Sequence, residues 1–239
     1  MAGCDFRLPV PSRKIQRGWR GDAASLAGLG GAGLTVVLRL SGGRRLRSPK
    51  GELARPTTAR VRQAVMNMLA GELRGCRWLE LCGGSGVMAC EALQRGAAAV
   101  VLVEMDRRVA AVARANLAAV AEAIAPEGGR APTVAVVERE VLRFLGRGAL
   151  ASGLAPFDLI YADPPWAAGL HGALAEAVAA GGWLATGGTL LWESGLGTAL
   201  TIPPGWRERL RRAYGASELV LLEPWTTTAP RSTAEGFQP

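Results

Sequence analysis

Several residue types and patterns are scarce in this 239-residue chain, and each scarcity excludes a class of protein. Apolar runs fall short of the roughly 18 residues that a membrane-spanning helix needs. The first twenty residues carry charge and proline and lack the apolar core of a signal peptide, so we expect no cleaved leader. These absences favour a cytoplasmic protein.

Histidine and cysteine are too sparse to predict a metal centre. The four cysteines, at positions 4, 76, 82 and 90, contain no C-x-x-C pair, so we expect reduced thiols without zinc ligation or a disulfide framework. His171 is the single histidine. We interpret it as a surface residue of a helix, without a catalytic role.

Lysine is nearly absent, because only two of the 28 basic residues are lysines. Residues 1–62 hold 13 basic and 3 acidic side chains, a balance of +10, whereas residues 63–239 hold 15 and 17, a balance of −2. An arginine-rich segment suits a nucleic-acid backbone, since the guanidinium group presents a planar fork to phosphate oxygens. The competing interpretation is a solvated tail produced by a GC-rich coding bias.

The hydrophobic share of 49% is enough to build the core of one large domain. Residues 1–33 are rich in glycine, alanine and charge and contain no apolar periodicity, which predicts disorder. We divide the chain into a disordered tail (1–33), a small β-hairpin that contacts RNA (34–56), the main domain (57–224) and a flexible tail (225–239).

The N-terminal quarter contains the candidate phosphate contacts. Residues 34–40 are rich in β-formers and predict a strand, which the Ser-Gly-Gly turn at 41–43 ends. The loop that follows is basic. Its candidate phosphate-binding residues are Arg44, Arg45 and Arg47.

A helix is predicted after Pro56, with a threonine in position to cap its first turn. Apolar residues recur at 61, 65, 68 and 69, which gives one buried stripe. Arg60 and Arg62 fall off that stripe, so we expect them to face a ligand; simple solvation is the alternative. Arg55 precedes the helix and completes this basic group.

A strand over 77–81, a glycine-rich loop and a helix over 87–94 follow in order. Gly84 and Gly86 let the backbone approach a nucleotide-like ligand closely, although a lone G-x-G is a weak signal. Glu80 lies at the end of the strand. The next strand ends on Glu104, 18 residues after Gly86, where a carboxylate commonly binds a ribose diol.

Alternating strands and helices continue along the chain and predict a mostly parallel sheet with helices on both faces. Further strands are expected at 133–137, 157–162 and 188–193, a long helix from Asp106 to about 122, and a helix over 169–180. Glu140 follows the strand at 133–137. A closing antiparallel hairpin over 206–214 and 218–222 departs from a plain dinucleotide-binding fold.

The most informative stretch is Asp163-Pro164-Pro165-Trp166, directly after a buried strand. The Asp163 carboxylate and the Pro164 carbonyl are two hydrogen-bond acceptors, and the indole of Trp166 is a flat stacking surface. Together they suit a planar amine. The competing interpretation is an ordinary Pro-Pro turn in which Asp163 is a turn residue and Trp166 packs in the core.

These motifs together resemble one family. The segments E-x-C-x-G-x-G at 80–86, Glu104 and D-P-P-W at 163–166 resemble class I S-adenosylmethionine-dependent methyltransferases that act on exocyclic amines. The stretches R-P-T-T-x-R-V-R at 55–62, E-A-L-x-R-G-A at 91–97 and V-E-x-D at 103–106 look like the bacterial 16S rRNA guanine-N2 methyltransferases. The likeness runs from about residue 36 to 223.

The resemblance implies a Rossmann-like α/β fold with a seven-stranded sheet and methyl transfer from S-adenosyl-L-methionine to guanine N2 in 16S rRNA. The type implied is the one that modifies guanine 966, in a partly assembled small subunit, without metal. It implies a catalytic role for Asp163, Pro164 and Trp166. It assigns the cofactor to Glu80, Gly84, Gly86, Glu104 and Glu140, and the RNA to the arginines at 44, 45, 47, 55, 60 and 62.

The sequence departs from the family pattern at a few positions. Glu80 stands where aspartate is usual, Cys82-Gly83 where Phe-Ala is usual, Glu140 where Asp or Asn is usual, and Trp166 where Phe or Tyr is commoner. Two enzyme alternatives share such a turn, the adenine-N6 DNA and the glutamine-N5 protein methyltransferases. A third alternative is an RNA-binding ribosome-assembly factor without catalysis.

Overall fold

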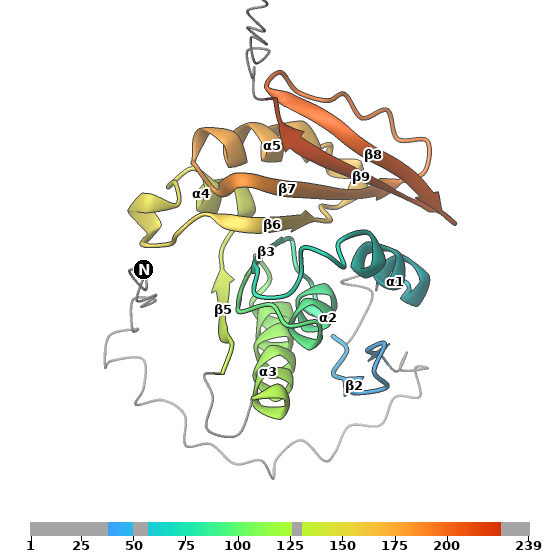
Figure 1. The fold of residues 1–239 in the computed structure, drawn as a ribbon, viewed down its shortest axis with the longest axis vertical. Coiled ribbons are helices and arrows are strands. Elements are labelled where there is room, and N and C mark those ends of the chain that lie inside the picture. The colour runs from blue at the N-terminus through green and yellow to red at the C-terminus, as the bar shows by residue number, and fades with distance from the viewer. Residues whose placement is uncertain (1–37, 50–56, 126–130, 226–239) are drawn as a thin grey trace, which may run out of the picture.

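A seven-stranded sheet forms the centre of the molecule. The computed structural model describes residues 38–49, 57–125 and 131–225 (Figure 1). The strands lie in the order β5-β4-β3-β6-β7-β9-β8. Their bounds are β3 Arg77–Leu81, β4 Ala99–Glu104, β5 Thr133–Glu138, β6 Phe157–Ala162, β7 Leu184–Gly195, β8 Trp206–Tyr214 and β9 Ser217–Pro224.

Strands β3 to β7 pair in parallel, whereas β9 runs antiparallel to both β7 and β8. This arrangement confirms the predicted mostly parallel sheet with a closing hairpin. Parallel neighbours need a crossover, and each crossover between adjacent β-strands here carries a helix. β7 is longer than the sequence predicts, because it begins at Leu184 instead of Gly188.

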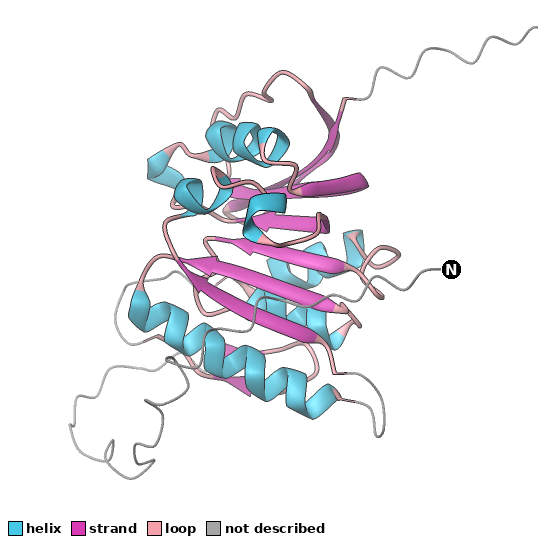
Figure 2. Cartoon of the chain, turned by 90° about the vertical axis from the view of Figure 1, so that its left-hand side faces the viewer, coloured by secondary structure: helices cyan, strands magenta, loops and turns pink. Residues whose placement is uncertain are grey.

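Helices cover the two faces of the sheet as separate layers (Figure 2). One core contains apolar side chains of α1 (Ala59–Met68), α2 (Val87–Gln94) and α3 (Arg107–Ile124). The other contains those of α4 (Val141–Leu145) and α5 (His171–Ala180). Strand residues alternate between the two cores, as the period of two requires. We call the two faces of the sheet the α1 face and the α5 face.

The first described residues form a short hairpin of β1 (Leu38–Arg39) and β2 (Arg45–Leu46). The sequence predicted a β-hairpin segment over 34–56 with a longer first strand, 34–40, and the arginines in a loop after the turn; residues 34–37 and 50–56 lie outside the described part. Side chains of two helices hold the hairpin. The amide and hydroxyl of Ser41 donate to Glu91 of α2, at 2.9 and 3.0 Å, and Asn116 of α3 exchanges two bonds with the Arg47 backbone.

Two helix starts agree with the sequence. The Thr58 hydroxyl accepts from the Val61 amide and caps α1, and the Asp106 carboxylate accepts from two amides at the start of α3. Such caps typically contribute about 1 kcal/mol each. No helix in the described part of the chain is long and apolar enough to cross a membrane.

Candidate active site

The carboxyl ends of three adjacent strands bring the predicted site residues together. In the sheet register Leu81 of β3 lies opposite Val103 of β4 and Ala162 of β6. The next residues along these strands are therefore neighbours at one edge: Cys82, Glu104 and Asp163. Open α/β sheets bind their ligands at this edge.

The loop after β3 is closely packed on one side and open on the other. A Cβ atom on Gly83 would lie 2.4 Å from the Leu102 side chain, so any other residue there would require Leu102 to move. Gly84 and Gly86 have positive φ angles of 52° and 75°, and the space beside Gly84 is open. The loop backbone can therefore approach a ligand without a side chain intervening.

Cys82 is the one non-glycine residue of the described chain with a positive φ, 58°. This conformation is uncommon for a residue with a Cβ and costs on the order of 1 kcal/mol. Burial raises the pKa of its thiol to about 12, and the nearby carboxylates of Glu104, Asp163 and Glu140 contribute to this rise. Cys82 is thus an uncharged thiol at the centre of a group of carboxylates.

The Glu104 carboxylate is fixed by backbone amides at the end of β4. Its two oxygens accept from the Gly84 amide at 3.0 Å and from the Asp106 amide at 2.8 Å. A carboxylate offers about four acceptor positions, so capacity remains for the hydroxyls of a ligand. Glu104 and the glycine loop, far apart in sequence, therefore form one unit.

Glu80 lies beneath this unit, buried in the α1 face with 2% exposure. Burial raises the pKa of its carboxyl to about 8, and the charges of Asp163 and Glu104 add to the effect. The indole N–H of Trp78 donates to it at 3.3 Å. Glu80 is therefore held by Trp78 and the backbone of Ala89 in α2 and is not exposed at the surface of the loop.

Glu140 lies at the same edge, two residues beyond the end of β5. Its oxygens accept from the Leu142 and Arg143 amides, at 2.9 and 2.8 Å, and cap α4. The sequence predicted the position but not this capping role. The cluster of carboxylates makes the edge negatively charged, which favours a ligand with a positively charged group.

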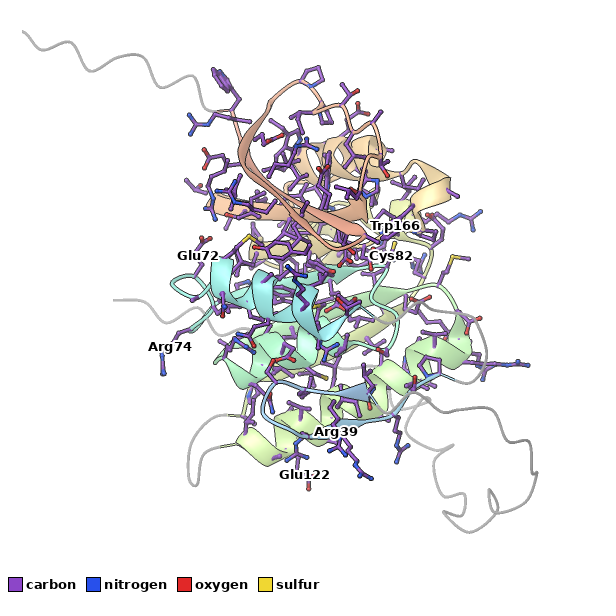
Figure 3. The ribbon with its side chains drawn as sticks, turned by 90° about the vertical axis from the view of Figure 1, so that its right-hand side faces the viewer. Arg39, Glu72, Arg74, Cys82, Glu122 and Trp166 are labelled. Carbon is purple, nitrogen blue, oxygen red and sulfur yellow. The ribbon has the colours of Figure 1, made fainter. Side chains whose placement is uncertain are left out.

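The turn after β6 contains the Asp163–Trp166 motif. Pro164 is buried, and Asp163 and Trp166 are half-buried. Trp166 begins the short 3-10 helix η3 (Trp166–Ala168), and its ring lies against Gly195 at the end of β7, where an added Cβ would be 2.7 Å away. In Figure 3 Cys82 and Trp166 lie at one end of the sheet, and Glu72 and Arg74 at the other.

A buried polar network that the sequence did not predict supports this turn. The Tyr161 hydroxyl, two residues before Asp163, donates to the Glu193 carboxylate of β7, and the Ser217 hydroxyl of β9 donates to the other oxygen at 2.9 Å. Burial raises the pKa of Tyr161 well above its ordinary value, and the charge of Glu193 adds to this. The one sequence signal that could have predicted this network was Glu193, a glutamate inside an otherwise apolar strand.

The prediction that His171 is a surface residue is wrong. It is 2% exposed, and its Nε2 lies 2.9 Å from the Glu193 carbonyl oxygen. Burial lowers the pKa of its imidazole. The hydrogen bond to β7, on which α5 packs, holds the His171 side chain inside the fold. Because this contact joins two distant segments, the local sequence around His171 could not predict its burial.

The predicted RNA contacts divide into two groups. Arg44, Arg45, Arg47 and Arg60 are exposed, and within the described chain none of them has a carboxylate at ion-pair distance. Arg55 lies outside the described residues. The remaining prediction, that Arg62 faces a ligand, is wrong.

Arg62 is a structural residue with 6% exposure. Its guanidinium donates to the Thr57 and Arg39 carbonyl oxygens, both at 2.6 Å, and pairs with Glu91 at 3.5 Å. It therefore ties the hairpin to α1 and α2.

Among the described residues no cluster of three or more His, Cys, Asp or Glu side chains is placed to hold a metal ion.

Comparison with known proteins places this geometry in a family. The sequence model of the family described as "Conserved hypothetical protein 95" matches residues 37–223. Ribosomal RNA small subunit methyltransferase D of Escherichia coli K12 is 33% identical over 174 residues, which are 72% of this chain and 81% of that protein. The chain belongs to the small subunit methyltransferase D family.

Solved structures similar to this chain agree with that assignment. The structure of yhhF from Escherichia coli superposes with a TM-score of 0.65 at 30% identity and covers 79% of this chain and 98% of its own. A hypothetical protein from Thermus thermophilus gives a TM-score of 0.61, also at 30% identity, over 78% and 99% of the two chains. The family match over residues 37–223 spans the sheet up to Glu223 and the residues of the candidate site.

Proposed function

We propose that this protein transfers a methyl group from S-adenosylmethionine to the exocyclic N2 of a guanine in 16S rRNA. The observation that carries the proposal is the meeting of the Asp163–Trp166 turn with the glycine loop and Glu104 at one sheet edge. Membership of a family that contains rRNA methyltransferases gives the substrate class. Guanine 966 is the proposed target.

The residues at this edge suit S-adenosylmethionine. The open backbone at Gly84, with Gly86 beyond it in the same loop, would lie along the methionine end. Glu104 would accept from the ribose hydroxyls, and Glu140 would accept from the adenine amine. The surrounding carboxylates suit the positive sulfonium and ammonium groups of the cofactor. When bound, the cofactor supplies an activated methyl group.

The residues of the turn would align and activate the amine. Asp163 and the Pro164 carbonyl would each accept one N–H of the guanine amino group, which favours a pyramidal nitrogen whose lone pair points at the methyl group. Asp163 would also stabilise the positive charge that develops on this nitrogen. Positioning of this kind supplies most of the rate in a transfer that needs no metal.

Trp166 would stack on the guanine ring. The Trp166 ring lies against Gly195 and is partly exposed at this edge, where it would meet a base that is single-stranded or flipped out of a helix. The buried Tyr161–Glu193 pair would keep the strand end rigid below Asp163. A rigid scaffold is what an acceptor pair aimed at one nitrogen requires.

Exposed arginines of the N-terminal hairpin would bind the RNA backbone. Arg44 precedes β2, Arg45 lies on it and Arg47 directly follows it, and Arg60 lies on the first turn of α1. As their RNA partner we propose 16S rRNA in a partly assembled small ribosomal subunit.

The test is identification of the product. Unmethylated 16S rRNA, free and in partly assembled subunits, is incubated with the protein and isotope-labelled S-adenosylmethionine, then digested to nucleosides for mass spectrometry. The proposal predicts labelled N2-methylguanosine. Labelled N6-methyladenosine or a labelled protein would support another enzyme of this fold, and RNA binding with no label would support an assembly factor.

A further inference from the structure

A groove between α1 and the tip of the β8–β9 hairpin is left unexplained by the methyl-transfer site. It has a volume of about 490 Å³, within the range of small-ligand sites. Arg60, Gln63, Asn67 and Met68 of α1 line one side of it, and Tyr214 at the end of β8 lines the other. Figure 1 shows α1 beside this end of the hairpin.

The groove lies on the same face and edge of the sheet as Trp166. Tyr214 is opposite Ser217 of β9, and Ser217 is opposite Gly195 of β7, against which Trp166 packs. Tyr214 packs on the α1 face of the sheet. A Cβ atom on Gly195 would point to the same face, where it would meet the Trp166 ring. Two strand spacings, about 10 Å, separate the two aromatic positions.

The lining is suited to a nucleotide and not to an apolar ligand. The half-buried Tyr214 ring offers a stacking surface. The Gln63 Nε2 donates to the Asn67 Oδ1 at 2.7 Å, which leaves the Gln63 Oε1 as an acceptor and the Asn67 Nδ2 as a donor at the groove. Exposed side-chain amides beside an aromatic ring can bind the edge of a stacked base.

The charges around the groove favour an anionic strand. Three arginines of β8, at positions 207, 209 and 211, are neutralised by glutamates. Arg212 is exposed, and its side chain shares the α1 face with Tyr214, two residues away. Within the described residues no carboxylate pairs with Arg212 or Arg60. Two cations without carboxylate partners thus flank the groove.

We propose that this groove is a second nucleotide subsite. A base that neighbours the target guanine in the single-stranded RNA stacks on Tyr214, and Arg60 and Arg212 bind its phosphates. The proposal rests on the proposed function and deepens it, because the subsite selects RNA in which an unstacked base lies next to the target. Stacking is tolerant of base identity, so the subsite reads single-stranded character more than sequence.

The experiment measures the affinity for unmethylated 16S rRNA by filter binding, and the affinity for S-adenosylmethionine by calorimetry. Tyr214→Leu keeps an apolar side chain against the core and removes the stacking surface. Loss of one stacked base should weaken RNA binding about 5- to 150-fold and leave cofactor affinity unchanged. Tyr214→Phe should bind RNA like the wild type.

Two further variants complete the test. Arg212→Ala, an exposed change without packing consequences, should reduce the slope of log K against log salt by about 0.7. Trp225→Ala removes an exposed aromatic at the other end of the same hairpin and should leave RNA affinity unchanged. Methylation kinetics of Tyr214→Leu should show a raised KM for RNA with little change in kcat.

The outcomes separate the two proposals. Wild-type protein that neither binds nor methylates RNA would overturn the proposed function and this inference with it. Wild-type protein that methylates RNA while Tyr214→Leu and Arg212→Ala bind it equally well would overturn the subsite alone. An equal loss in the Trp225→Ala control would also overturn it, because the effect would then not be local to the groove.

Discussion

Replacing Arg62 by methionine separates two interpretations of the basic N-terminal segment. Methionine keeps an unbranched apolar stem in the buried position and removes the guanidinium. The change deletes two hydrogen bonds of 2.6 Å to the Arg39 and Thr57 carbonyl oxygens and the 3.5 Å pair with Glu91. The two carbonyl oxygens lose a donor, and the buried Glu91 carboxylate loses one of its two cationic partners.

The expected cost follows from what remains around Glu91. Breaking a buried ion pair typically costs about 3–5 kcal/mol. Glu91 still pairs with Arg95 at 2.7 Å and accepts two bonds from Ser41, so its charge is not left alone. We therefore expect a loss near the lower end, about 3 kcal/mol, or roughly 6–12 °C in Tm for a protein of this size.

Urea denaturation measures this loss, with Arg60→Ala as the matched control. Arg60 is exposed on the same helix, so its replacement should change the free energy of unfolding by less than about 0.5 kcal/mol. RNA affinity should fall for Arg60→Ala and stay close to wild type for Arg62→Met below its midpoint. An Arg62→Met protein of undiminished stability with weakened RNA binding would refute the structural role.

Three further predictions concern charged residues. The Glu80 carboxyl keeps its proton up to a pH of about 8 in the folded protein, whereas the unfolded chain releases it near 4.5. The stability that this difference contributes is therefore complete below pH 4.5 and is lost as the pH rises through about 8. Glu80→Gln should flatten this fall in the free energy of unfolding, and an unchanged pH dependence would contradict the assignment. Glu104→Ala should weaken cofactor binding roughly ten- to a hundredfold by calorimetry, since ribose hydroxyls lose a charged acceptor; equal affinity would make Glu104 a loop support only. Replacing Arg44, Arg45 and Arg47 by alanine should lower the salt slope of RNA binding by about 0.7–0.9 for each lost phosphate contact, and an unchanged slope would leave them as solvated surface.

Local signals predicted most of the fold. The order of strand, glycine-rich loop and helix predicted α2 at its observed bounds, and short apolar runs placed the strands of the sheet, because each pattern is contained in a short stretch of chain. The site edge could be predicted for the same reason. Parallel strands end at one edge, so Glu104 and Asp163 had to lie at the same edge once their strands were assigned, with β3 between them in the observed order.

Contacts between segments that are distant along the chain could not be predicted from the sequence. Arg62 looked exposed because helical periodicity counts an arginine as polar, but its partners lie on the hairpin and on α2. His171 and Glu193 are 22 residues apart and meet only through the packing of α5 on β7. The fit of Trp166 against Gly195 likewise depends on the strand order, which no local pattern contains.

The central claim is that Asp163 aligns and activates a guanine amine at this edge. The most direct measurement is the single-turnover rate of N2-methylguanosine formation in 16S rRNA by wild type, Asp163→Asn and Asp163→Ala, with cofactor binding measured in parallel. The account predicts intact cofactor binding, a rate about 10²–10³ lower for Asp163→Ala, and a milder loss for Asp163→Asn, whose amide oxygen still accepts a hydrogen bond. An Asp163→Ala protein that forms N2-methylguanosine at the wild-type rate would contradict it.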